Sequence, residues 1–312
     1  MTGTEPPFVV VHGGVHKTAT SHLQAMLHRN AGRLRKRGVH YIPHRAARKD
    51  YTYPCHLNGY QKLGLGFRRK MPDDALQAQA RAFFEAVAAG PGERIILSDE
   101  NMPGHCGQCV RSGDLYQRRD TLVPIFAGHI VYPVHEVHLG LRNYADFFAS
   151  AYVEYLRSAR GAEILGEAAM KRAVLGRMPG WDGLVDAVRA SFPDARLILW
   201  RHEDFAALAQ RIIGNLCGPG IDPAELVAPA RVRGRPSASH RAVRELLAEV
   251  ARVGAEAALA RRVEIQERYP RGDTWPGYDP WTADERAHLT RLYARDIADL
   301  RARADLDFLC PG

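Results

Sequence analysis

The chain has 312 residues, of which 46% are hydrophobic and 25% charged, and no apolar run approaches the roughly 18 residues that cross a bilayer. A membrane-spanning protein is therefore not expected. The formal net charge of +8 suits a polyanionic ligand, but the basic residues fall in short groups without the aromatic pattern of RNA-binding modules, so no nucleic-acid partner is predicted. Residues 1–7 show no secretory signal and the five cysteines are an odd number, which predicts a cytoplasmic protein without a disulfide framework.

Short apolar runs alternate with helical patterns along the chain. That alternation is typical of βα units around a largely parallel central sheet flanked by helices, so we predict an α/β fold. The predicted strands are Phe8–Val11, Val39–Ile42, Arg94–Leu97, Glu136–Leu141 and Arg196–Trp200. The predicted helices are about 18–37, 72–89, 144–160, 181–192, 205–216, 241–265 and 283–304.

A single domain over residues 1–312 is predicted, because no repeat or low-complexity segment divides the chain. Its α/β core spans 8–205, and the C-terminal part 236–312 is predicted to be helical. Residues 44–70 and 103–119 show no clear period, and their length favours functional loops over simple connections. We interpret these two segments as loops that face a substrate.

The first predicted strand runs into a glycine-rich turn that ends in a lysine, His12-Gly13-Gly14-Val15-His16-Lys17-Thr18-Ala19-Thr20-Ser21, and an amphipathic helix follows. Glycines let successive backbone N–H groups point inward, Lys17 adds a positive charge, and the helix directs its positive end to the same place. This combination predicts an anion site for a ligand that carries phosphate. His16 stands where the usual nucleoside-triphosphate loop has glycine before the lysine, so the turn departs from that motif.

Further chemistry is expected at the carboxyl ends of the strands, where open parallel sheets bind ligands. The residues that follow the later predicted strands are Ser98 to Asn101, Arg142, and Arg201 to Asp204. Arg142 offers a planar guanidinium for a second phosphate. Ser150 follows it eight residues later, on a helix face apart from the apolar stripe, so its hydroxyl is not a core filler.

Three pieces in this order resemble the sulfotransferases that use 3′-phosphoadenosine 5′-phosphosulfate (PAPS). The turn from His12 to Ser21 looks like that family's 5′-phosphosulfate loop, with Ala19 in place of the usual glycine. Arg142 with Ser150 looks like its 3′-phosphate motif, and residues 95–100 resemble the acidic strand end of bacterial members. The resemblance covers about residues 8–205 and implies a P-loop-like sulfotransferase architecture.

The resemblance implies transfer of a sulfuryl group from PAPS to a hydroxyl or amine of a small molecule or glycan, with 3′,5′-bisphosphorylated adenosine as product and no metal required. The residues implied to bind the nucleotide are Gly13, Gly14, His16, Lys17, Thr18, Ala19, Thr20, Ser21, Arg142 and Ser150. Lys17 is expected to stabilise the charge that grows on the departing 5′-phosphate.

Glu100 is the predicted base that takes the acceptor's proton, because it follows a strand beside the expected cleft. Burial near Leu97 would raise the pKa of its carboxyl group, whereas Lys17 nearby would lower it. The sequence leaves open which effect dominates. Asp99, His56 and His105 are the alternative bases.

Two other functions remain open on the sequence. In a P-loop kinase, Asp99 would hold magnesium and Lys17 would contact the β- and γ-phosphates. In a non-catalytic nucleotide- or polyanion-binding protein, Glu100 would have no chemical task. The sequence indicates neither the acceptor nor the oligomeric state.

A basic cluster and a pair of cysteines could each either bind a ligand or have no functional role. The basic run Arg231–Arg235 either closes over the 3′-phosphate or forms a solvated surface before a helix. Cys106 and Cys109 are interpreted as plain loop thiols, because no second pair of ligands accompanies them as a structural zinc site requires.

Overall fold

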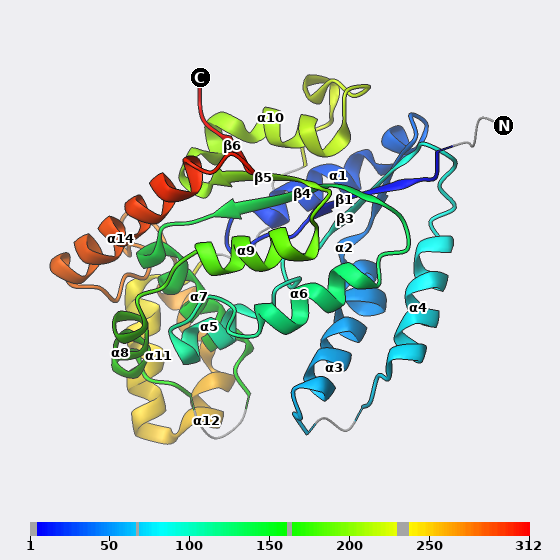
Figure 1. Ribbon diagram of the computed structural model, residues 1–312. Helices are drawn as coiled ribbons and strands as arrows, with labels where there is room; N and C mark the ends of the chain where they lie inside the picture. Colours follow the sequence, from blue (N-terminus) through cyan, green and yellow to red (C-terminus); the bar gives the residue numbers. More distant parts are fainter. Residues whose placement is uncertain (1–4, 67–68, 161–163, 230–236) are drawn as a thin grey trace.

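A six-stranded, all-parallel sheet forms the centre of the protein in the computed structural model, which describes residues 5–66, 69–160, 164–229 and 237–312 (Figure 1). The strand order is β2-β3-β1-β4-β5-β6. The strands are β1 (Phe8–His12), β2 (Val39–Ile42), β3 (Arg94–Ser98), β4 (Val134–Leu141), β5 (Arg196–Arg201) and β6 (Asp307–Leu309). The α/β class with a parallel sheet is therefore confirmed, and because the strands are parallel their carboxyl ends meet at one edge.

Helices cover both faces of the sheet. They are α1 (Thr20–Arg35), α2 (His44–Ala46), the π-helix η1 (Ala47–Thr52), α3 (Tyr53–Lys62), α4 (Asp73–Glu85), α5 (Cys106–Ser112), α6 (Arg119–Gly128), α7 (Tyr144–Ser158), α8 (Glu167–Arg177), α9 (Asp182–Ser191), the 3₁₀ turn η2 (His202–Asp204), α10 (Phe205–Cys217), the 3₁₀ turn η3 (Pro223–Glu225), α11 (His240–Val253), α12 (Ala255–Ala260), α13 (Arg262–Arg268) and α14 (Ala283–Arg301).

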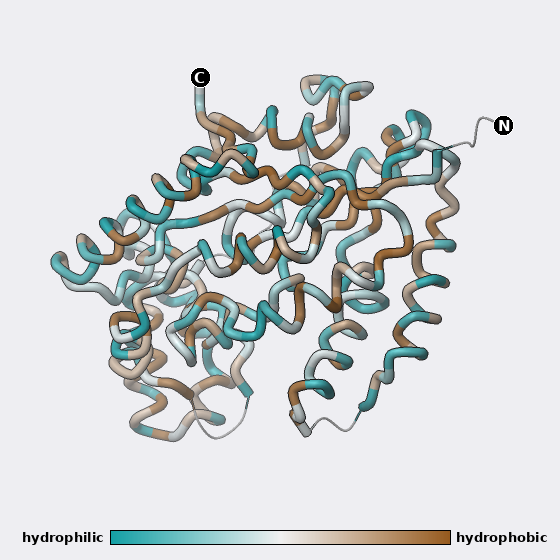
Figure 2. The backbone as a smooth tube through the Cα atoms, in the orientation of Figure 1, coloured by the Kyte–Doolittle hydropathy of each residue, from teal (hydrophilic) through white to brown (hydrophobic). Residues whose placement is uncertain are grey.

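The alternation of side chains along the strands produces two hydrophobic cores. Val10 and its neighbours on one face pack under α1 and α10. Val9 and Val11 face the larger core, which α3 to α9 and the C-terminal helices cover. The strands at the centre are accordingly among the most hydrophobic segments of the chain (Figure 2).

The segment 44–70 is mostly helical, so its prediction as a loop was wrong. From His44 to Lys62 the chain runs through α2, η1 and α3 without interruption. Ala47, Tyr51 and Cys55 recur every four residues and are fully buried. The polar and basic side chains between them concealed this helical period in the sequence.

The segment 103–119 was also predicted as a loop, and that prediction was wrong over residues 106–112, which form α5. Gly113 ends this helix with φ +71°, and an added Cβ there would lie 2.1 Å from the Ala173 carbonyl oxygen. Two further helices, α6 and α8, were not predicted from the sequence.

The C-terminal part is helical as predicted, apart from two breaks and one strand. The predicted helix 241–265 divides into α11, α12 and part of α13: Gly254, with φ +84°, separates the first two, and Arg261 separates α12 from α13. Strand β6 (Asp307–Leu309) pairs with β5 and was missed because three residues carry too little period-2 signal. The run Arg231–Arg235 lies outside the described residues.

Among the described helices none combines the length and apolar character that a membrane crossing needs. The longest, α14, has 19 residues, and buried positions such as Leu289, Tyr293 and Ile297 lie on one side of it. It contacts α7 and leads into β6. Its apolar stripe thus belongs to the core of the protein.

Candidate functional site

The glycine-rich turn lies between β1 and α1, at the carboxyl edge of the sheet (Figure 1). Gly14 has φ +96°, and an added Cβ would lie 2.8 Å from the backbone Cα of Glu100. A side chain at this position is therefore excluded by both conformation and space. Lys17 and Ala19 also take left-handed conformations, each with φ 66°, which curls the backbone before the helix begins.

Strand β4 holds the turn in place from the other side. The backbone N–H of Gly140 donates to the carbonyl of Gly14 at 2.6 Å, and the N–H of Val15 donates to the carbonyl of Gly140 at 3.2 Å. An added Cβ on Gly140 would lie 3.0 Å from the Cβ of Thr18, so the turn packs closely against this strand. The turn is thus pre-formed rather than dependent on a ligand for its shape.

The backbone of the turn offers several donors at one place. The N–H groups of Lys17, Ala19, Thr20 and Ser21 donate to no acceptor within the described parts of the chain. The last two belong to the first turn of α1, whose N-cap residue Ala19 supplies no side-chain cap. Such a cluster of N–H groups at the positive end of a helix is suited to an anion.

The hydroxyl groups of Thr18 and Thr20 both donate to the Val15 carbonyl, at 2.6 and 3.2 Å. Their hydrogens therefore stabilise the turn itself. The two side chains are buried, whereas Ser21 is exposed. The structure thus places all of the residues predicted around the 5′-phosphosulfate in one turn, with the threonines in a partly structural role.

Lys17 extends toward α7, where its Nζ lies 3.2 Å from Oε2 of Glu154. The same carboxylate accepts from Arg157 at 2.8 Å. Both Lys17 and Glu154 are about three-quarters buried, with side-chain exposures of 23% and 28%. Because the lysine side chain is flexible, its ammonium group can pair either with Glu154 or with an anion bound at the turn.

Arg142 leaves the end of β4 and donates from Nη1 to the carbonyl of Lys17 at 2.8 Å. Its Nε is buried and has no hydrogen-bond partner among the described residues. Burial lowers the pKa of this guanidinium, the carboxylates of Asp146 and Glu203 oppose that change, and Arg271 nearby adds to it. A second positive group with an unsatisfied donor therefore lies directly beside the turn.

Ser150 lies on α7, half-buried and outside the stripe of buried aromatic residues, as the sequence indicated. No hydrogen bond in the described part of the chain joins it to Arg142. The structure therefore puts the two residues on consecutive elements, β4 and α7, without bringing them into direct contact.

Glu100 lies against Gly14, so the predicted base and the glycine-rich turn are neighbours. Its carboxylate accepts from Arg48 at 2.8 Å and from Gln24 at 3.1 Å. Burial alone would raise the pKa of Glu100, but the positive charge of Arg48 and further hydrogen bonds outweigh burial and hold the pKa below its ordinary value. Glu100 is thus ionised and able to accept a proton, at reduced basicity.

The neighbouring carboxylate, Asp99, accepts hydrogen bonds from two side chains. Arg48 donates to Asp99 Oδ1 at 2.7 Å, and the side-chain amide of Asn101 donates to the same oxygen at 2.8 Å. Arg48 was not foreseen, because its segment was interpreted as a loop; it lies six residues past the end of β2, at the same edge of the sheet. The rule that ligands gather at strand ends could have found it.

A histidine-rich network continues from the turn. His16 contacts the Tyr116 hydroxyl through Nδ1 at 2.9 Å and Asn101 Oδ1 through Nε2 at 3.2 Å. His105 contacts the same Asn101 oxygen through Nδ1, and His56 contacts the Asn101 carbonyl through Nε2 at 2.8 Å. Because the two Asn101 oxygens only accept, His16 Nε2, His105 Nδ1 and His56 Nε2 carry the hydrogens, and the Tyr116 hydroxyl donates to His16 Nδ1. The alternative bases His56 and His105 therefore help to hold the site together.

Burial of neutral imidazoles makes this network sensitive to acid. Burial, with His105 adding to it, lowers the pKa of His56 to about 3, and burial also lowers that of His12 to about 3. Since the unfolded chain binds these protons near pH 6.5, stability should fall as the pH drops below that value toward 3.

We expect His56→Gln to reduce the loss of unfolding free energy between pH 7 and pH 5 by about 2 kcal/mol relative to the unmodified protein. Glutamine keeps a donor for the Asn101 carbonyl but does not titrate. Urea denaturation at the two pH values measures the difference. Equal losses in both proteins would show that His56 does not stay neutral in the folded state.

Cys106 and Cys109 lie on helix α5, so their interpretation as loop thiols was wrong. Both are buried, and burial raises the pKa of Cys106 to about 12. Both thiols are thus protonated and inert near neutral pH. Lys17 lowers the pKa of Cys106 by less than burial raises it, whereas Glu154 and Glu100 add to the effect of burial. Within the described ranges, no cluster of three or more His, Cys, Asp or Glu side chains is arranged to hold a metal ion.

Comparison with models of known protein families and with curated proteins finds no match. The site is therefore interpreted from its own geometry. Its parts are a pre-formed turn with unpaired N–H groups, the Lys17 ammonium paired with Glu154, the half-buried Arg142 guanidinium, and a carboxylate against the turn. Together they can hold a ligand with two separate anionic groups and accept a proton between them.

Proposed function

We propose that the protein is a PAPS-dependent sulfotransferase. The observation that carries the proposal is the Arg142–Lys17 hydrogen bond, because it sets a second cationic group, the Arg142 guanidinium with its unsatisfied Nε, against the glycine-rich turn. A nucleotide with phosphate at both its 5′ and 3′ positions needs two such sites. The resemblance of the turn, of Arg142 with Ser150, and of residues 95–100 to this family supports the same activity.

In this proposal the turn binds the 5′-phosphosulfate through its N–H groups, and Lys17 moves from Glu154 to the phosphate oxygens. The acceptor's oxygen or nitrogen bonds to sulfur while the bond from sulfur to the 5′-phosphate oxygen breaks. Negative charge grows on the departing phosphate, where Lys17 and the helix end stabilise it. Glu100, beside Gly14, takes the acceptor's proton.

The kinase alternative has less support from the contacts of Asp99. A kinase would use this carboxylate as a magnesium ligand. In the structure, its Oδ1 already accepts hydrogen bonds from Arg48 and from the side-chain amide of Asn101. Its side chain is also fully buried. A cation would have to displace the Arg48 guanidinium in order to bind Asp99.

Calorimetry tests the proposal directly. We expect 3′,5′-bisphosphorylated adenosine to bind in excess chelator at least tenfold more tightly than ATP, and transfer from labelled PAPS to proceed in the same chelator. Tighter binding of ATP with magnesium, or loss of transfer on chelation, would instead favour the kinase. Binding without any sulfated product would favour a non-catalytic nucleotide-binding protein.

Arg142→Ala should weaken the binding of 3′,5′-bisphosphorylated adenosine by about 2–3 kcal/mol and hardly change that of adenosine 5′-phosphosulfate, which lacks the 3′-phosphate. Calorimetry on both nucleotides measures the two effects. Arg201→Ala is the matched control, since Arg201 ends the neighbouring strand β5 and pairs with Asp204. Equal losses for both nucleotides would place Arg142 away from the 3′-phosphate.

A further inference from the structure

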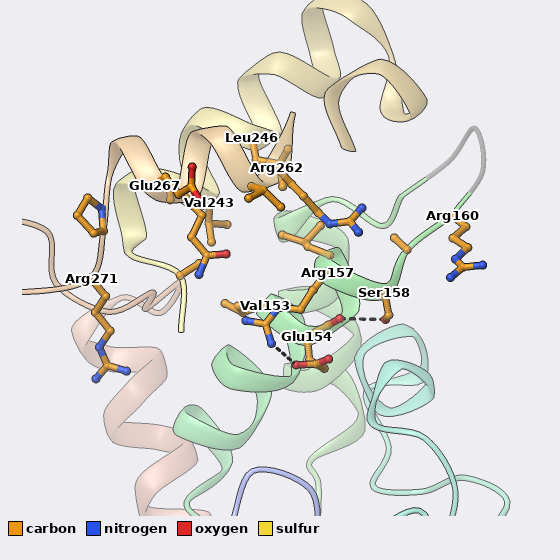
Figure 3. A pocket seen from close by; sticks show the side chains of 17 residues that line it. Val153, Glu154, Arg157, Ser158, Arg160, Val243, Leu246, Arg262, Glu267 and Arg271 are labelled. Atoms are coloured by element: carbon orange, nitrogen blue, oxygen red, sulfur yellow. Dashed lines mark hydrogen bonds and ion pairs between the residues drawn. The ribbon is translucent and has the colours of Figure 1, made fainter. Parts of the chain in front are cut away.

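A cavity of about 870 Å³ lies between the C-terminal half of α7 and the helices α11 and α13 (Figure 3). Its size is in the range of sites that enclose small molecules. None of its lining residues comes from the segments 44–70 and 103–119, which were predicted to face the acceptor. One wall of the cavity is formed by α11 and α13, for which the sequence predicted no role beyond a helical C-terminal part.

The lining combines an apolar surface with an excess of positive charge. Val153 and Leu156 on α7 lie opposite Val243 and Leu246 on α11. The charged lining residues are four arginines and two glutamates: Arg157, Arg160, Arg262, Arg271, Glu154 and Glu267. A ligand that fits this lining has an apolar body and an anionic group.

The arginines of the cavity differ in their partners. Arg157 pairs with Glu154 at 2.8 Å. Within the described parts of the chain, no ion pair joins Arg160, Arg262 or Arg271 to a carboxylate. Arg262, which is half-buried, donates only a weak bond of 3.3 Å to the Leu259 carbonyl. These guanidinium groups are therefore suited to an incoming carboxylate, sulfate or phosphate.

One residue connects the cavity to the phosphate turn. Glu154 lines the cavity and also accepts from Lys17 at 3.2 Å. Lys17 is the residue that the proposed function places on the 5′-phosphosulfate. An acceptor in the cavity would thus approach the sulfuryl group from the Glu154 side.

We propose that this cavity binds the acceptor, and that the acceptor is an amphipathic anion with a hydroxyl or amine directed toward Glu154 and Lys17. The inference rests on the proposed function and specifies its substrate class. In the transfer, the hydroxyl or amine bonds to sulfur, and the sulfur–oxygen bond to the 5′-phosphate breaks. The proton passes to Glu100, and 3′,5′-bisphosphorylated adenosine leaves.

The first test uses three naphthols that differ only in one group: 6-hydroxy-2-naphthoate, 6-hydroxynaphthalene-2-sulfonate and the neutral 6-hydroxy-2-naphthamide. We expect calorimetry to show that at least one of the two anions binds at least tenfold more tightly than the amide. The better anion distinguishes a carboxylate from a sulfate-like ligand. Equal binding of all three, or binding of none, would overturn the proposed acceptor class.

Variants then locate the binding. Arg262→Gln should weaken the preferred anion about tenfold and leave the amide unchanged, whereas Arg241→Gln, on α11 but outside the lining, should change neither. Leu246→Trp should fill the cavity and weaken all three compounds. If a thermal melt shows that this variant does not fold, Val263→Trp at the exposed rim replaces it. Unchanged binding in both Arg262→Gln and the cavity-filling variant would overturn the site.

Nucleotide binding separates this inference from the proposed function. In the cavity-filling variant, 3′,5′-bisphosphorylated adenosine should bind normally, while transfer from labelled PAPS to the preferred naphthol falls at least tenfold. If the nucleotide binds the unmodified protein but transfer is unaffected by cavity filling, the cavity is not the acceptor site. If no variant or parent binds the nucleotide, the proposed function itself fails.

Discussion

Lys17→Ala is expected to lower transfer from PAPS by about 10³-fold while the protein stays folded. The lysine is the one charged side chain of the turn, and its effect falls on the charge that develops as the 5′-phosphate departs. The turn itself depends on backbone bonds to Gly140 and on two threonine hydroxyls, none of which the substitution removes. Turnover beside a thermal melt measures both parts of the prediction.

Lys171→Ala is the matched control for this variant. Lys171 is about as buried as Lys17, at 19% exposure, and also pairs with one carboxylate, Glu285. It lies on α8, away from the turn. Its loss should cost a similar amount of stability and leave turnover unchanged. Near-normal activity in a folded Lys17→Ala protein would contradict the role assigned to the turn.

Glu100→Gln is expected to lower turnover by roughly 10²–10⁴-fold and to leave nucleotide affinity unchanged. Glutamine keeps the size of the side chain and can still accept from Arg48, but it cannot take a proton. Because Arg48 holds the pKa of Glu100 below its ordinary value, the carboxylate is ionised across the neutral range, and turnover should fall only when acid protonates it.

The control for Glu100→Gln is Glu136→Gln. Glu136 is a partly buried carboxylate that pairs with Arg94 and His138 and lies opposite Val10 of β1, outside the turn. Turnover assays of Glu154→Gln separate two roles at the site. Glu154 positions Lys17, whereas Glu100 is the residue proposed to take the acceptor's proton. If Glu100→Gln turned over normally, the base would have to be sought at Asp99, His56 or His105, or at Glu154.

Much of the fold could be predicted from local patterns. Five strands were found because continuous runs such as Val9 to Val11 are typical of buried parallel strands. The turn before α1 was found because glycines, a lysine and a helix start stand together. The helices from Ala47 to Lys62 were missed, since polar side chains lie between the buried positions Ala47, Tyr51 and Cys55.

The sequence by itself determined the parallel sheet, the position of the glycine-rich turn, and the placing of Arg142 and Glu100 at strand ends, because each depends on residues adjacent in the chain. Only the tertiary structure determined which charged side chains form ion pairs. The pairs Lys17–Glu154 and Arg48–Glu100 join residues 137 and 52 positions apart, and the cavity between α7, α11 and α13 joins walls that are about as distant. Such contacts follow from the packing of helices on the sheet, which no local period encodes.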